Sequence, residues 1–191
     1  MLPLIEGSIL LDDIDISRVS SSTVRAAFNV IPQTPVLFPV SIRTNLDVLG
    51  IHSDSSIISI LQKFDLWSSV ESRGGLDADI DTTPLGQGQT QLLCIARGLL
   101  NIGKKKILLF DEFTSSLDKE MEERVIRLVR TEYKGLTVVA IAHRLDTIIE
   151  FDKVMVFERG ELVEHGAPQE LLKIKGGSFV ALWEEYVNGR S

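Results

Sequence analysis

The stretch KILLFDEFTSSLD, residues 106–118, decides the fold class. A short apolar run, typical of a buried strand, ends in the adjacent carboxylates of Asp111 and Glu112, and a small-polar turn leads to a third acid, Asp118. A carboxylate at a strand end can hold Mg²⁺, and its neighbour can polarise an attacking water, as phosphoryl transfer requires. The alternative is a pair of solvated acids in a turn, because short motifs often match by chance.

The segments around this strand alternate between helical and strand patterns. Apolar residues recur at intervals of three and four in 53–67 and 90–100, which predicts a helix in each. The other elements expected are a strand in 7–16, a short helix and a proline-rich extended segment in 20–39, a helix in 119–133, a buried strand in 136–142, a short helix in 143–151 and a hairpin in 153–166 turning near Arg159 and Gly160. Helices alternating with apolar strands indicate an α/β fold, a parallel sheet covered by helices on both faces.

Length and charge limit the classes of function. The chain of 191 residues suits one domain, and its net charge of −7 argues against a nucleic-acid partner, which needs a clustered positive field. The single cysteine, Cys94, excludes an internal disulfide and suits a reducing compartment. The apolar runs are far shorter than the ~20 residues that a membrane-spanning helix needs.

Three other features suit phosphate chemistry. The glycine-rich loop LGQGQ, residues 85–89, precedes a helix whose exposed amides can bind an anion; the alternative is an ordinary helix entry. His143 follows a strand and can contact a terminal phosphate, or it is a capping or core histidine. Gln33 lies between prolines and can orient a water or coordinate a metal, or it is a polar loop residue.

The order of these features resembles the nucleotide-binding domain of an ABC transporter. The matching segments are Gln33 (the Q-loop), LGQGQTQLLCIARGLL (the signature loop and its helix), KILLFDE (the Walker B strand), SSLD (the D-loop) and AHRLDTI (the switch-histidine loop). FPVSIRTNLD is most similar to the second such domain of subfamily C, the multidrug-resistance-protein-like exporters. The resemblance implies a P-loop NTPase-type α/β domain in which a helical subdomain at about 45–100 is inserted between the core segments 1–44 and 101–191.

The resemblance also implies a function, cofactors and partners. It implies ATP hydrolysis, with ATP and Mg²⁺, coupled to export of an unspecified solute at the cytosolic face of a membrane. The implied partners are a second nucleotide-binding domain in a head-to-tail dimer and the transmembrane domains of the same transporter.

Roles are implied for individual residues as well. Asp111 and Gln33 would hold the metal at the chain's own ATP site, Glu112 would be the general base, and His143 would contact the γ-phosphate. The signature loop that covers a partner's ATP would be Leu85, Gly86, Gln87, Gly88 and Gln89. The D-loop at the dimer interface would be Ser116, Leu117 and Asp118.

Two departures from the family pattern qualify this interpretation. Serine is usual where this chain has Gly86, and glycine keeps the backbone amide but removes a hydroxyl. No G-x-x-x-x-G-K-[ST] phosphate loop occurs in the chain. In the family, that loop and the aromatic residue that stacks on adenine both precede the equivalent of Gly7. The sequence is therefore expected to be a truncated fragment. The cause would be a gene-model error, a pseudogene remnant or a genuine truncation.

Two alternatives stay open at this stage. One is a free-standing degenerate module that caps a partner subunit's ATP without hydrolysing any. The other is a soluble ABC ATPase of the chromosome-maintenance or translation type, which the acidic charge, the absence of coiled-coil heptads and the exporter-like AHRLDTI disfavour.

Overall fold

A computed structural model describes residues 4–82, 84–103, 105, 107–112, 117–141 and 144–189. The chain divides into two compact units, Met1–Ile141 and Ala142–Ser191, each with its own hydrophobic core. The division into core and helical subdomain made from the sequence stays a prediction.

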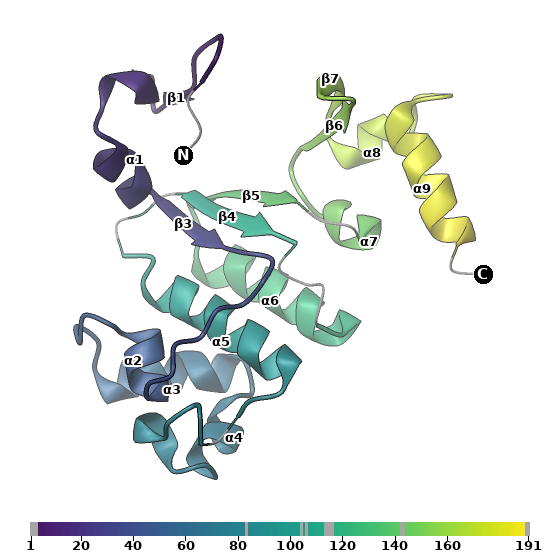
Figure 1. Cartoon of the computed structure of the whole chain (residues 1–191). Helices are drawn as coiled ribbons and strands as arrows, with labels where there is room; N and C mark the ends of the chain where they lie inside the picture. Colours follow the sequence, from purple (N-terminus) through teal and green to yellow (C-terminus); the bar gives the residue numbers. More distant parts are fainter. Residues whose placement is uncertain are drawn as a thin grey trace. The chain divides into compact units, whose positions relative to one another are not determined.

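A parallel three-stranded sheet forms the centre of the first unit (Figure 1). Its strands are β3 (Phe28–Ile31), β4 (Ile107–Asp111) and β5 (Thr137–Ile141), in the order β3-β4-β5. Because the strands are parallel, all three carboxyl ends meet at one edge of the sheet. The α/β class and the parallel sheet are thus confirmed.

Helices and short strands complete this unit. The helices are α1 (Ser21–Ala27), α2 (Ile42–Leu46), α3 (Asp54–Lys63), α4 (Trp67–Glu71), α5 (Gln87–Leu100) and α6 (Lys119–Glu132), with 3₁₀ turns at Ile16–Arg18 and Gly75–Asp77. The helices predicted in 53–67, 90–100 and 119–133 are confirmed as α3, α5 and α6. Residues 7–16 were expected to form one strand, and that prediction is wrong. They form an antiparallel hairpin of β1 (Leu10–Leu11) and β2 (Ile14–Asp15), because Asp12 and Asp13 turn the chain at positive φ.

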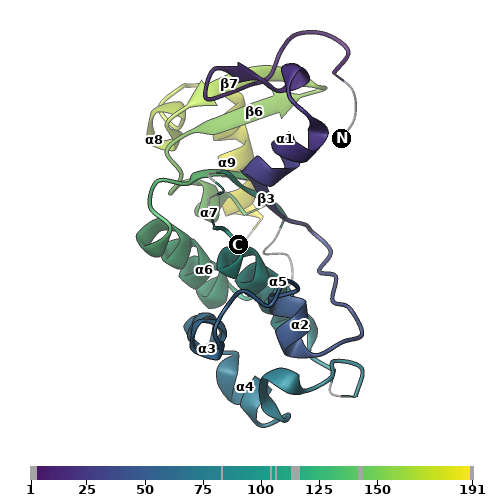
Figure 2. The same cartoon turned by 90° about the vertical axis from the view of Figure 1, so that its left-hand side faces the viewer.

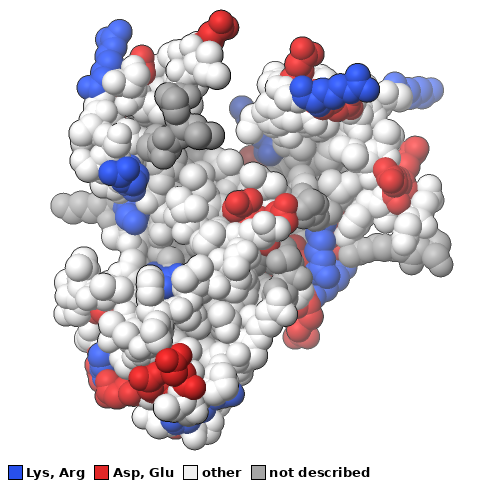
Figure 3. Space-filling model, in the orientation of Figure 1, with Lys and Arg blue, Asp and Glu red and all other residues white. Residues whose placement is uncertain are grey.

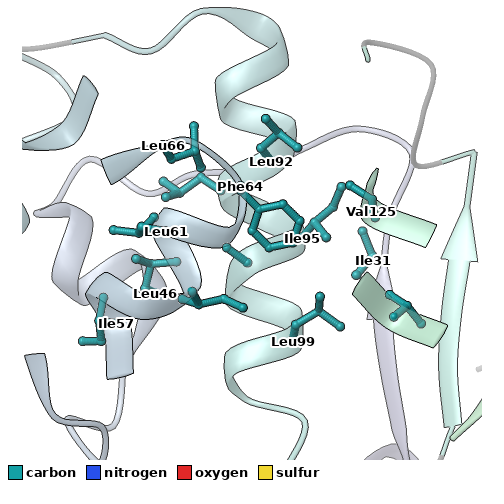
Figure 4. Close-up of a cluster of buried hydrophobic side chains, with 14 of the residues drawn as sticks. Ile31, Leu46, Ile57, Leu61, Phe64, Leu66, Leu92, Ile95, Leu99 and Val125 are labelled. Atoms are coloured by element: carbon teal, nitrogen blue, oxygen red, sulfur yellow. The ribbon is translucent and has the colours of Figure 1, made fainter. Parts of the chain in front are cut away.

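The core of the first unit lies between the sheet and the helices. Figure 4 shows the Phe64 ring beside Ile95 of α5, with side chains of α3 on one side and Ile31 of β3 on the other. Helix α5 approaches β3 closely at Gly98, where a Cβ would lie 3.0 Å from Ile31 Cδ1. Glycine at this position therefore lets helix and strand pack together, and the Asn29 side chain donates a hydrogen bond to the Gly98 carbonyl oxygen.

The opposite face of the sheet carries apolar side chains that are exposed within this unit. Val30, Val139 and Ile141 expose 57%, 42% and 58% of their surface. The segment 136–142 was predicted to be a buried strand. In its described part, β5, the residues alternate between half-buried and exposed, because helices α5 and α6 cover one face only (Figure 1).

The second unit is built on an antiparallel hairpin (Figure 2). Its elements are α7 (Leu145–Ile148), β6 (Val154–Glu158), β7 (Glu161–Gly166), α8 (Pro168–Leu171) and α9 (Ser178–Asn188). The predicted turn is confirmed at Arg159 and Gly160, which both have positive φ. Helices α8 and α9 pack against β7 around the buried ring of Phe179.

Candidate functional site

The carboxyl edge of the sheet brings together three of the predicted site residues. Gln33 follows β3, Asp111 ends β4, and Glu112 comes directly after Asp111. Gln33 and Asp111 are exposed, and Glu112 is half-buried. A polar cluster at this edge of an open parallel sheet is where α/β proteins commonly bind ligands.

The backbone of Glu112 is held in an unusual conformation. Its φ is +46°, in the left-handed region that side chains other than glycine rarely adopt. Its N–H donates a hydrogen bond of 3.0 Å to the Ile141 carbonyl oxygen, which extends the β4–β5 ladder by one step beyond Asp111. Conformations of this kind cost of order 1–3 kcal/mol and persist where the surroundings hold them, often at functional sites.

The side chains of Gln33 and Glu112 meet directly. The Gln33 Nε2 atom donates a hydrogen bond to Glu112 Oε2, although the residues are 79 positions apart in the sequence. The amide and the carboxylate therefore form one polar group at the carboxyl edge, with Asp111 next to it in the chain.

The donor set at this edge fits Mg²⁺ that arrives with a polyphosphate. Among the described residues no group of three or more His, Cys, Asp or Glu is placed to hold a metal ion. Mg²⁺ does not need such a cage, because it prefers oxygen ligands and is usually bound by one or two carboxylates plus substrate phosphates. The Asp111 carboxylate has the chemistry of such a ligand.

The signature loop lies at the start of helix α5. Gly86 is the N-cap residue, and its N–H donates 3.3 Å to the Gln89 Oε1 atom, while Gln89 Nε2 donates 2.9 Å to Ser69 Oγ. Leu85 packs against the core, whereas Gly86 and Gln87 are exposed. The loop is anchored through Gln89, which accepts from the Gly86 N–H, and Gly86 and Gln87 lie at the surface.

This loop lies at the other end of α5 from the contact with the sheet. Gly86 precedes Gly98, which packs against Ile31, by twelve residues, or about 18 Å along a helix. The signature loop is thus separated from the point where α5 packs on β3.

The described part of the D-loop begins helix α6. Leu117 is 6% exposed and belongs to the core, and Asp118 is the N-cap, with Oδ1 accepting 2.8 Å from the Met121 N–H. This bond gives Asp118 a local structural role, and its place at a dimer interface stays a prediction. The remaining predicted site residues, Ser116 and His143, lie outside the described residues.

Sequence reasoning missed two supporting groups. The Ser69 hydroxyl holds Gln89, and the Ile141 carbonyl oxygen holds the Glu112 backbone. No pattern marks one serine in the polar stretch after Trp67. The Ile141 contact was foreseeable only from the pairing of β4 with β5.

The surface charge is mixed, and one ion cluster is well defined. Figure 3 shows Lys and Arg interspersed with Asp and Glu on the face drawn. The Arg43 guanidinium donates hydrogen bonds to both Asp54 and Asp77, and these bonds hold the pKa of each carboxyl below its ordinary value. The expectation that no nucleic acid binds stays a prediction.

Comparison with known proteins identifies related sequences. The family model described as "ABC transporter" matches residues 1–115. "ABC multidrug transporter B" of Aspergillus fumigatus is 38% identical over 96% of this chain, which covers 12% of that protein. "ATP-binding cassette sub-family C member 2" of Homo sapiens is 40% identical over 89% of this chain, which covers 11% of it. The chain thus spans about an eighth of the length of these curated relatives.

A solved structure has the same fold. A bacterial Atm1-family ABC exporter with ATP bound superposes with a TM-score of 0.85 and is 31% identical, over 95% of this chain and 32% of that one. Over its described residues, the present chain contains no helix with the length and apolar content that crossing a membrane requires.

Proposed function

Because the chain belongs to the ABC transporter family, we propose that it is part of a nucleotide-binding domain that hydrolyses ATP, with Mg²⁺, to drive export of a solute. The family match, the subfamily C relative and the structural likeness to an exporter support this proposal. The observation that carries the chemistry is the convergence of Gln33, Asp111 and Glu112 at the carboxyl edge of the sheet.

In this proposal the two acids have different tasks. Asp111, exposed at the end of β4, would hold Mg²⁺ through water. Glu112 accepts a proton from the water whose oxygen attacks the γ-phosphorus, and the bond from that phosphorus to the β–γ bridging oxygen breaks, so that ADP leaves with the electron pair. Mg²⁺, when bound, neutralises charge on the phosphate oxygens.

The other assigned residues complete the site in the same proposal. His143 contacts the γ-phosphate of the chain's own site. The signature loop, residues 85–89, covers the ATP of a second nucleotide-binding domain in a head-to-tail dimer, and Asp118 lies across that interface.

We further propose the arrangement implied by the family. Residues 45–100 form a helical subdomain, residues 1–44 and 101–191 belong to the core, and the domain works beside transmembrane domains at the cytosolic face of a membrane. One hydrophobic cluster joins α3 and α5 of this subdomain to the sheet.

Glu112→Gln in a full-length transporter that contains residues 1–191 tests the proposal. We expect ATP turnover to fall by about 10²–10⁴-fold, the usual contribution of a general base. Nucleotide binding should persist, because the amide preserves the size of the side chain.

The matched control is Glu184→Gln on the exposed surface of α9. It should leave turnover unchanged. If Glu112→Gln behaved like this control, Glu112 would not be the base and the proposed mechanism would be wrong.

A further inference from the structure

Helix α7 closely follows the predicted switch histidine in the sequence. The N-cap residue of the helix is Arg144, and His143 directly precedes it. Consecutive Cα atoms lie about 3.8 Å apart. Whatever fixes the amino end of α7 therefore restricts the positions that His143 can occupy.

Helix α7 is too short to be stable by itself. It has four residues, whereas isolated helices of fewer than about 12–15 residues are marginal in water because the first turn is costly to form. The helix therefore depends on contacts with the rest of the second unit.

Two kinds of contact hold α7 in place. Leu145 and Ile148, which are one helical turn apart, pack against the buried cluster that contains Phe179 of α9. In addition, the Tyr186 hydroxyl of α9 donates a hydrogen bond of 2.6 Å to Asp146 Oδ1. An O–H···O⁻ bond of this length is charge-assisted and about twice as strong as a bond between neutral groups.

Tyr186 lies on the packed face of α9. Phe179, Trp183 and Tyr186 are spaced by four and three residues, so they share one face of the helix. Phe179 is buried, and the other two are half-buried. The Trp183 and Tyr186 ring centroids are 6.1 Å apart, with 37° between the ring planes. The Tyr186 ring is therefore packed against its own helix, while its hydroxyl reaches a residue 40 positions earlier in the chain.

We propose that Tyr186 is a positioning residue for the switch-histidine loop: its hydroxyl ties α9 to Asp146 and so fixes the helix that follows His143. This inference rests on the proposed function, in which His143 contacts the γ-phosphate. Tyr186 acts through Asp146 and α7, and it does not touch the nucleotide.

Tyr186→Phe in the full-length transporter tests this role, because it removes only the hydroxyl. We expect kcat to fall by about tenfold, since a 1 Å displacement of a catalytic group can cost about 10²-fold and the phenyl ring keeps part of the packing. KM for ATP should change by less than about twofold.

The kinetic comparison needs a correction for folding and a control. Turnover is divided by the amount of ATP bound, so that a loss of folded transporter does not appear as a lower kcat. Tyr133→Phe alters the only other tyrosine of the 191 residues, at the end of α6 in the first unit, and should keep the parent kcat.

Substitutions of the acceptor test the same bond from the other side. Asp146→Asn keeps an oxygen that accepts from Tyr186, whereas Asp146→Ala removes it. Asp146→Ala should lower kcat at least as much as Tyr186→Phe, and Asp146→Asn should retain most of the parent kcat. Tyr186→Phe should have little further effect in the Asp146→Ala background, and fully additive losses would contradict the proposal.

Amide hydrogen exchange of the 191-residue chain tests the contact without any turnover. The Ile149 N–H donates 3.1 Å to the Leu145 carbonyl oxygen, so the segment 144–151 reports on the order of α7. Tyr186→Phe should speed exchange in this segment by about tenfold, the change in local opening that follows the loss of one hydrogen bond to a charged group. Exchange in the hairpin, residues 154–166, should not change. Unchanged exchange in 144–151, or equal acceleration in both segments, would overturn the local positioning role.

The outcomes distinguish this inference from the proposed function. If Glu112→Gln abolishes turnover but Tyr186→Phe behaves like Tyr133→Phe, ATP hydrolysis stands and the positioning role is wrong. If Glu112→Gln leaves turnover intact, the general base is misassigned, and the exchange measurement still decides whether Tyr186 orders α7.

Discussion

Removal of the Glu164 carboxylate should undock helix α9 from the hairpin of the second unit. The Glu164 Oε1 atom accepts 2.8 Å from the Ser178 N–H, and Oε2 accepts 2.9 Å from the Phe179 N–H, so one carboxylate satisfies two amides that a helix N-terminus leaves unpaired. Gly177 lies so close that a Cβ there would be 2.7 Å from Glu164 Oε1. The cap is therefore tightly packed.

The size of the effect follows from these two bonds. Each hydrogen bond to a charged group contributes about 1.5–3 kcal/mol, and Glu164 is half-buried, so the lower end applies to each. We expect Glu164→Ala to lower the free energy of unfolding by about 2–3 kcal/mol. With a urea m-value of about 2 kcal/mol/M, the midpoint would fall by about 1–1.5 M. Glu164→Gln should lose about half as much, because a neutral oxygen acceptor remains.

Trp183 provides the assay, because it lies on α9 itself. The only other tryptophan is Trp67, and in a Trp67→Phe background the urea-induced change in fluorescence reports the second unit alone. Glu161→Ala, on the exposed surface of the same strand, is the control and should change stability by less than about 0.5 kcal/mol. A midpoint for Glu164→Ala equal to that of Glu161→Ala would refute the argument that this carboxylate anchors α9.

Three further predictions concern the ion cluster, the signature loop and nucleotide binding. Arg43 lowers the folded-state pKa of Asp54 and Asp77, so its stabilising effect is present above the unfolded pKa and is lost as the pH falls through the folded values. Arg43→Met should therefore lower the stability to urea more near neutral pH than at about pH 2.5. An equal loss at both pH values would contradict the ion-pair account. Gly86→Ser in the full-length transporter should raise ATP-dependent crosslinking across the site shared with the partner domain, because it adds a hydroxyl donor, and no gain would count against the phosphate-facing assignment. The 191-residue chain alone, which carries no phosphate-loop sequence, should bind Mg-ATP only at millimolar or weaker affinity. The reason is that losing three charge-assisted hydrogen bonds costs about 4.5–9 kcal/mol. A dissociation constant below ~100 µM in isothermal titration would show that other residues hold the phosphates.

Local patterns in the sequence were sufficient for most secondary structure and for the types of residue at the site. Apolar spacing predicted α3, α5 and α6, and the pair Arg159–Gly160 predicted the hairpin turn, because helix periodicity and turn geometry depend on residues close together in the chain. The acids after the apolar run of β4 marked the carboxyl edge for the same reason.

The tertiary structure alone decided how these residues meet. Gln33 lies opposite Glu112 because β3 and β4 pair in one register among many, and local sequence does not specify that register. The Ser69–Gln89 bond and the Glu164 cap of α9 likewise join segments whose approach depends on the packing of whole elements. The local sequence also could not predict that one face of β5 is exposed. An apolar strand has the same sequence pattern whether or not a helix covers it, because coverage is set by the long-range arrangement of the chain.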